Sequence, residues 1–287
     1  MRTLIIGTAV AACAAACSSD KTPAATTTKS AAPASQPASA PAPAAPKVPD
    51  ITLELGEMVA EKNGIKLSKL DKSPEFPKSR LFLRRPPFDS KIDANQTFTF
   101  EIVNYELGAQ TTKDPFIANS GKGQHIHFIV DNGPYMAKYT PKFEAELGKG
   151  SHVVLAFLSR SHHESIKHGF TLTRLHVDEK TEEIQELSLD SAPHMFYSRP
   201  KGTYTGKDTK RVLLDFFLVG VKLSKEGNKV EATINGQKFM LTEWIPYVIE
   251  GLPMGEAKIK LRLVDKKGKT IPGPFNEVER TVTLAEG

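Results

Sequence analysis

Cysteine is nearly absent from this 287-residue chain, in which Cys13 and Cys17 are the only two. Both lie near the start, so the rest of the chain cannot form an internal disulfide bond. It also offers no thiolate nucleophile and no cysteine metal site. The folded part must therefore be stabilised by core burial, and a body of this length is large enough for that.

Sequence motifs of common catalytic sites are missing as well. The chain contains no Gly-x-Ser-x-Gly, no His-Glu-x-x-His and no glycine-rich phosphate loop. Ser161 beside His162 or His163 is weak evidence for a serine hydrolase, because sequence neighbours on a strand point to opposite faces. The net charge of +5 is small and lacks the clustered basic residues of nucleic-acid-binding proteins. We expect a protein that is not an enzyme and binds no nucleic acid.

Long apolar runs are absent except at the start of the chain, where Leu4 to Ala16 follow Arg2. That run is shorter than the roughly 20 residues of a membrane-spanning helix, and it has the parts of a secretory signal. Ala14-Ala15-Ala16-Cys17 fits a lipobox, so we predict that residues 1–16 are removed and that Cys17 is lipidated. The alternatives are lipidation at Cys13, which would leave a very short apolar core, and an ordinary signal peptide.

Residues 17–50 have the composition of a linker. After Cys17 they are nearly all Ala, Pro, Ser and Thr, with almost no large apolar side chain to offset the entropy of ordering. Frequent proline favours extended geometry, so we expect a disordered tether between the membrane and the folded body. A neutral linker with no further role is the alternative. Ser18 lacks the aspartate that often marks inner-membrane retention, which favours the outer membrane.

The folded part contains an internal duplication, because four segments of its first half recur in the same order in its second half. The matched segments are 83–87 with 197–201, 98–107 with 214–223, 128–135 with 232–239, and 147–158 with 252–263. The offset falls from 116 residues at Leu107 to 105 at Leu158. The first copy therefore carries about eleven extra residues, which lie between Gly108 and Gln124.

Each copy has the pattern of short β-strands. Apolar residues alternate with polar ones around Phe100 and Phe216, and an Asn-Gly pair in each copy favours a hairpin. We therefore predict an all-β fold of two tandem immunoglobulin-like β-sandwich repeats, over residues 51–187 and 188–287. The alternative is a single larger sandwich formed from both copies.

Histidine is concentrated in the first copy and the loop that follows it, since six of the eight lie between His125 and His168. His125 and His127 fall on the same face of a predicted strand, and His152 begins another strand of the same copy. Three imidazoles that converge would bind copper or zinc, with affinity falling as the pH drops through about 6.5. Further ligands could come from Met136, His162-His163 or Glu164. The alternative is that His125 points outward, His127 forms hydrogen bonds within the sandwich, and no metal binds.

The loop after the second of these strands is rich in polar and charged residues. Charge-assisted hydrogen bonds from Arg are strong, so this loop could bind an anion; the alternative is a solvated loop. The residues of this additional ligand or anion site are Arg160, His162, His163, Glu164 and Lys167.

The segments 124–135, 159–167 and 249–255 resemble those of an uncharacterised family of bacterial lipoproteins with tandem β-sandwich repeats. The likeness covers most of residues 70–285, and some family members are labelled phosphopeptide-binding. The resemblance implies a peptide- or phosphopeptide-binding role, which would fit the basic loop but would not explain the His-x-His pair.

These observations predict a lipid-anchored binding protein of the cell envelope, whose ligand is copper or zinc held by His125, His127 and His152. The alternative is a non-enzymatic module that uses the 159–167 loop to recognise a peptide or phosphopeptide, a glycan or an envelope protein.

Overall fold

The computed structural model describes residues 53–112, 117–178 and 192–287. The predicted signal peptide, Cys17 and the linker lie outside these residues, so their predictions remain untested. No helix in the described part of the chain is long and apolar enough to cross a membrane. The one helical element among the described residues is the short 3-10 turn η1 (Gly206–Thr209).

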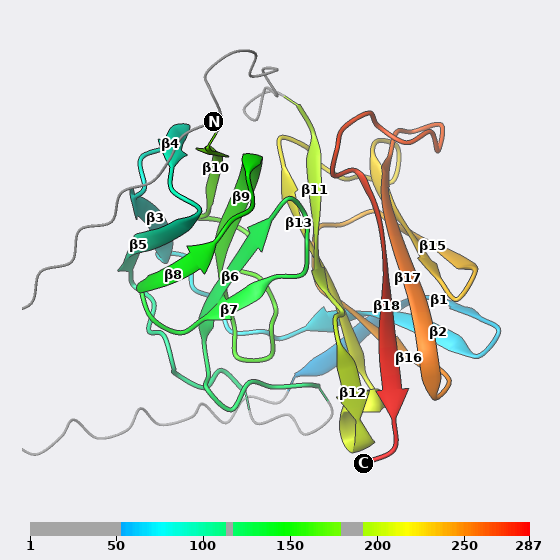
Figure 1. The fold of residues 1–287 in the computed structure, drawn as a ribbon. Coiled ribbons are helices and arrows are strands. Elements are labelled where there is room, and N and C mark those ends of the chain that lie inside the picture. The colour runs from blue at the N-terminus through cyan, green and yellow to red at the C-terminus, as the bar shows by residue number, and fades with distance from the viewer. Residues whose placement is uncertain (1–52, 113–116, 179–191) are drawn as a thin grey trace, which may run out of the picture. The chain divides into compact units, whose positions relative to one another are not determined.

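Residues 80–177 form a β-sandwich that we call the first repeat (Figure 1). Its five-stranded sheet has the order β4 (Ser90–Ile92), β10 (Thr171–Val177), β9 (Gly150–Ser159), β6 (His125–Val130) and β7 (Met136–Lys138). Its three-stranded sheet has the order β3 (Arg80–Arg85), β5 (Asn95–Val103) and β8 (Lys142–Glu146).

Residues 194–285 supply most of a second sandwich, the second repeat. One sheet has the order β12 (Thr203–Thr205), β18 (Glu277–Ala285), β17 (Gly255–Val264), β14 (Lys229–Ile234) and β15 (Gln237–Leu241). The other contains β11 (His194–Arg199), β13 (Val212–Val219) and β16 (Tyr247–Glu250). These orders repeat those of the first repeat strand for strand, with a parallel edge strand, β4 or β12, at the same place in each. The predicted fold of two tandem immunoglobulin-like sandwiches is confirmed.

The predicted boundary of the first repeat is wrong at its start. Strands β1 (Glu54–Lys62) and β2 (Ile65–Asp71) form a hairpin, and β2 pairs with β16 of the second repeat. Ile65 and Leu67 are buried in the core of that repeat. Residues 54–71, assigned to the first repeat by the range 51–187, therefore belong to the second. This pairing joins distant segments, and no local pattern in the sequence could indicate it.

The two repeats bury an apolar layer between them. On β9, Val154, Ala156 and Leu158 point into the core of the first repeat, and the alternate residues point to its other face. That other face packs on the second repeat, and the Phe157 and Phe217 rings stack with their centroids 4.6 Å apart. Asn132 strengthens the contact, because its side-chain amide donates to the Met195 and Phe275 carbonyls. The face of the first repeat that covers the second is therefore largely buried.

Candidate metal centre

His125 and His127 lie on this covered face of β6. Their neighbours Ile126 and Phe128 point the other way, into the core of the first repeat, as the period of two in a strand requires. Both imidazoles have no solvent exposure. Their Nε2 atoms lie 3.0 Å apart.

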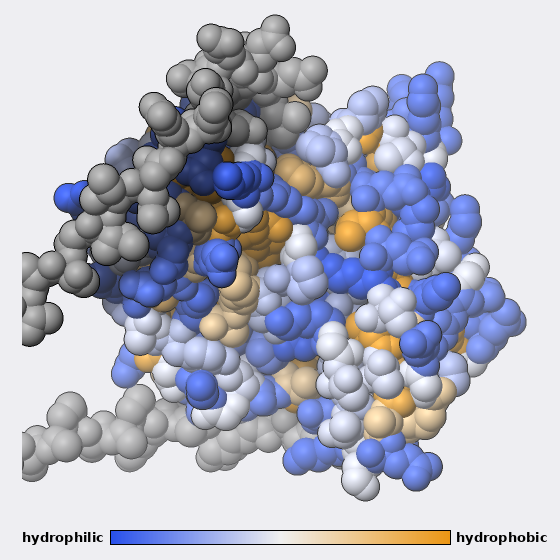
Figure 2. Space-filling model, in the orientation of Figure 1, coloured by the Kyte–Doolittle hydropathy of each residue, from blue (hydrophilic) through white to orange (hydrophobic). Residues whose placement is uncertain are grey.

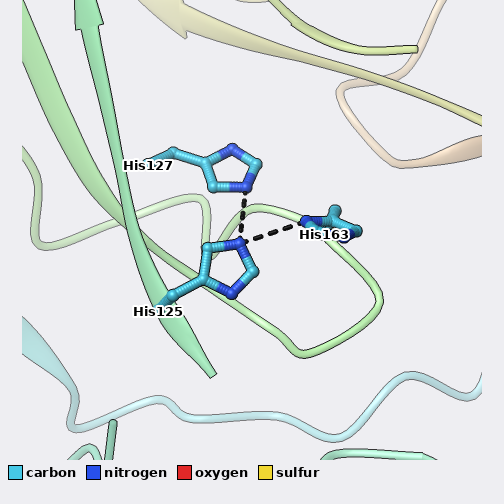
Figure 3. Close-up of side chains that lie close together, drawn as sticks. All are labelled: His125, His127 and His163. Atoms are coloured by element: carbon cyan, nitrogen blue, oxygen red, sulfur yellow. Dashed lines mark hydrogen bonds between the residues drawn. The ribbon is translucent and has the colours of Figure 1, made fainter. Parts of the chain in front are cut away.

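The third imidazole of the cluster is that of His163, in the loop that follows β9. Its Nδ1 lies 3.1 Å from His125 Nε2, and Figure 3 shows the three rings pointing toward one another. One nitrogen from each ring lies within 4.8 Å of the other two. A hairpin strand and a loop thus bring three imidazole nitrogens within 4.8 Å of one another.

The remaining nitrogens of the two strand histidines are held by neighbouring groups. His125 Nδ1 lies 2.8 Å from the Gly123 carbonyl, and His127 Nδ1 lies 3.1 Å from Ser198 Oγ of the second repeat. A carbonyl only accepts, so His125 Nδ1 must carry its proton, and its Nε2 presents a lone pair to the cluster. Gly123 has a φ of +78°, and a side chain there would collide with the Gly108 carbonyl. The glycine at position 123 therefore permits the backbone conformation that places its own carbonyl beside His125 Nδ1.

Burial keeps the cluster neutral. It lowers the pKa of His125 to about 4 and the pKa of His127 well below its ordinary value of 6.5. Burial also lowers the pKa of His163, with a smaller contribution from the nearby positive charge of Arg199. Neutral imidazole is the form that coordinates a metal ion.

The sequence-based placement of His152 is wrong. His152 pairs with Leu175, which points into the core of the first repeat, so its side chain lies on the face of the sheet opposite His127. Its position on β9 is also five residues before Phe157, the residue that pairs with His127. Its Nδ1 instead lies 2.6 Å from the Asp131 carboxylate and its Nε2 lies 2.8 Å from the Gly148 carbonyl.

The loop that carries His163 is supported by the insertion predicted between Gly108 and Gln124. Thr111 and Ser161 exchange two hydrogen bonds, each from a backbone amide to a side-chain hydroxyl, at 3.0 and 3.1 Å. The Ser120 amide donates to the Ser161 carbonyl. The insertion therefore fixes the His163 loop in place through contacts that the local sequence does not indicate.

A buried ionic network lies beside the cluster in the same loop. The Glu164 carboxylate pairs with Arg160 and His162, at 2.9 Å each, and accepts a hydrogen bond from Ser73. Burial alone would raise the pKa of Glu164, but Arg160 and His162 outweigh it and hold the pKa at about 2. Glu164 and His162 thus serve this network rather than the imidazole cluster.

The two cations proposed for an anion site are balanced inside the protein. Arg160 pairs with Glu164, while Lys167 Nζ lies 2.6 Å from the Asp215 carboxylate of the second repeat. Because both charges already have carboxylate partners, the loop offers no uncompensated cation to an anion. The geometry therefore weighs against the basic-loop alternative.

Tyr135 completes the surroundings of the cluster, and sequence reasoning did not select it. Its ring stacks on that of His127 with centroids 3.6 Å apart, and its hydroxyl lies 3.1 Å from His163 Nδ1. The one signal in the sequence was its place just after the Asn132-Gly133 turn, which leads the chain back past His127.

Solved structures of low similarity match about three quarters of this chain. The fibronectin(III)-like modules of Clostridium thermocellum CbhA share 10% identity over 72% of this chain and 94% of theirs, with a TM-score of 0.26. SGBP-B from the mixed-linkage glucan utilization locus of Bacteroides ovatus, solved in complex with a mixed-linkage heptasaccharide, shares 10% identity over 72% of this chain and 70% of its own, with a TM-score of 0.21. No family model matches the chain. No curated protein matches it either.

Proposed function

We propose that the protein is a non-catalytic, lipid-anchored binding protein of the bacterial cell envelope, whose first repeat binds one copper or zinc ion through His125, His127 and His163. The observation that carries the proposal is the approach of His125 Nε2 to His127 Nε2 at 3.0 Å and to His163 Nδ1 at 3.1 Å. Ligand nitrogens about 2.0–2.1 Å from one tetrahedral ion lie roughly 3.3 Å apart, which is close to these separations.

The positions of the protons on the three imidazoles support a cation bound between them. His125 Nε2 has a single in-plane lone pair, because the proton on Nδ1 is donated to Gly123. Two other ring nitrogens approach this lone pair, and only one of them could donate to it in good geometry. A cation would accept all three lone pairs at once. A ring N–H donated to a backbone carbonyl is also the usual outer contact of a metal-bound histidine.

The backbone conformation of His163 supports a functional role for its side chain. His163 has a φ of +71°, in the left-handed region, and Gly268 occupies the equivalent position in the second repeat with a φ of +80°. The loop hydrogen bonds agree, since the amides of His163 and Gly268 donate to the carbonyls of Arg160 and Asp265. The first repeat thus carries an imidazole where glycine would be relaxed, and such positions cluster at functional sites.

The donor set favours copper or zinc. Imidazole suits both ions, and three neutral ligands leave a coordination position for water or another group. We propose that the ion is bound without catalysis. The predicted signal peptide and Cys17 support the proposed place on the envelope, with the outer membrane favoured by Ser18.

Metal analysis of protein purified without a histidine tag tests this function. We expect one equivalent of copper or zinc per chain after reconstitution with either ion and dialysis. His127→Ala should lower the affinity at least about a hundredfold, more than is usual for the loss of an outer-shell contact. His152→Ala is the matched control and should bind as the wild type does. Absence of stoichiometric metal in the wild type, or equal binding by His127→Ala, would overturn the proposal.

A further inference from the structure

Three cations of the second repeat surround the turn that carries Tyr135. Arg280 Nη2 donates to the Asn132 and Gly133 carbonyls at 2.9 and 2.8 Å, and Lys201 Nζ donates to the Tyr135 carbonyl at 2.7 Å. Arg199, at the end of β11, donates to the Tyr204 hydroxyl at 3.0 Å. They come from two segments, the end of β11 with the residues that follow it and strand β18, and hydrophilic residues line the face where the first repeat meets β12 and β18 (Figure 2).

The cations share two tyrosine rings. Lys201 Nζ lies 4.0 Å and Arg199 Cζ lies 5.3 Å from the Tyr135 ring centroid. Arg280 Cζ lies 4.3 Å from the Tyr197 ring centroid. Burial lowers the pKa of Lys201, and the positive charges of Arg199 and Arg280 lower it further. The three charges are therefore close enough to repel one another.

No carboxylate in the described residues pairs with any of these three cations. Within the same residues, Arg199 Nε, Arg280 Nη1 and the Tyr197 hydroxyl are buried without a hydrogen-bond partner. Arg199 is only 7% exposed and Tyr197 is fully buried. Carbonyl dipoles and phenols weaken the repulsion, but they carry no net charge to balance it. Such an arrangement is costly unless an anion compensates it.

We propose that Arg199, Lys201 and Arg280, together with the Tyr197 hydroxyl, bind a small oxyanion such as a phosphate or sulfate group. The groups without partners are N–H and O–H donors, which suit the several acceptor oxygens of such an anion. Burial of Arg199 and Tyr197 limits the bound part to a small group. The equivalent Arg85 of the first repeat, which also precedes a proline at the end of its strand, is exposed.

This site is separate from the imidazole cluster. The Tyr135 ring stacks on His127 on one face, so Lys201, 4.0 Å above its centroid, must lie over the other face. One aromatic ring thus stands between the two groups of residues. The anion proposal needs no metal, and either proposal can fail alone.

Calorimetric titration of the metal-free protein with inorganic phosphate, and separately with phenyl phosphate, tests the anion site in a chelator-containing chloride buffer. We expect saturable binding of at least one of the two. Lys201→Gln and Arg280→Gln should each weaken it at least about tenfold, since each removes one charge-assisted interaction. Tighter binding of phenyl phosphate would identify the phosphate of a larger molecule as the ligand, and binding of phosphate alone would identify the free ion.

Lys229→Gln is the matched control, because Lys229 is also partly buried and donates to a backbone carbonyl, that of Gly227. It should bind phosphate as the wild type does. If the cations only hold the turn, the two glutamine variants will unfold more easily and phosphate will bind to none of the proteins. That result, or equal binding by all the variants, would overturn the proposal.

Discussion

The same strand positions face different surroundings in the two repeats. In the first, His127 pairs with Phe157 on a face covered by the second repeat. In the second, the equivalent residues are Glu231 and Arg262, whose side chains form an ion pair at 2.7 Å. The ion pair lies on a face that is partly open to solvent through Arg262, whereas a fully buried face permits stacked rings and neutral imidazoles. The fold itself thus requires no histidine; covering one sheet face made a buried imidazole cluster possible.

The largest difference that we expect between the repeats is in how much a substitution lowers stability in the loop after β9 and in the equivalent loop after β17. Glu164→Gln should destabilise the protein by about 3–5 kcal/mol, because it leaves the buried Arg160 without its charged partner. The equivalent Lys269 of the second repeat is exposed, so Lys269→Gln should change stability by less than about 0.5 kcal/mol. Urea denaturation measures both. Similar effects of the two substitutions would contradict the contrast.

The second largest expected effect is the loss of stability on acidification, which arises from the imidazole cluster of the first repeat. The pKa of His125 is about 4 in the folded protein and 6.5 ordinarily, so the unfolded chain binds more protons between these values. The free energy of unfolding of the metal-free protein should therefore fall as the pH drops from 6.5 toward 4, by up to about 1.4 kcal/mol per pH unit for this group. Denaturation at pH 7 and pH 5 measures the slope, which should be shallower in His125→Gln. An unchanged slope in this variant would refute the assignment.

The smallest expected effect concerns the shared left-handed position. Alanine at residue 163 or 268 should cost about 1 kcal/mol relative to glycine, because a Cβ strains this conformation. His163→Gly should thus be more stable than His163→Ala in metal-free protein, and Gly268→Ala should be less stable than the wild type. Thermal unfolding of the four proteins tests this. If alanine is as stable as glycine at both positions, the strain argument fails.

Much of the fold followed from local patterns in the sequence. Alternation around Phe100 and Phe216 predicted strands, the Asn-Gly pairs predicted hairpins, and the ordered matches predicted two sandwiches. The pairing of β2 with β16 could not be predicted, because strand partners distant in sequence leave no local signal.

The candidate site was predictable only in part, for the same reason. Period two placed His125 and His127 on one face, but it could not show that β9 carries His152 to the opposite face. His163 was one of several loop candidates, and its selection depends on a turn held by the distant Thr111. Arg280 meets Arg199 and Lys201 only because the two sheets of the second repeat pack together, which no local pattern in the sequence indicates.

The hairpin of β1 and β2 extends one sheet of the second sandwich, although it precedes the first repeat in the chain. Cleavage of the chain between the repeats would therefore leave the β1–β2 hairpin on the amino-terminal fragment, while its partner strand β16 would be on the carboxy-terminal fragment. A pull on the amino-terminal end would load the bonds between β1 and β2 first, and those between β2 and β16 next. The histidine-bearing sandwich would not be the first to bear such a force.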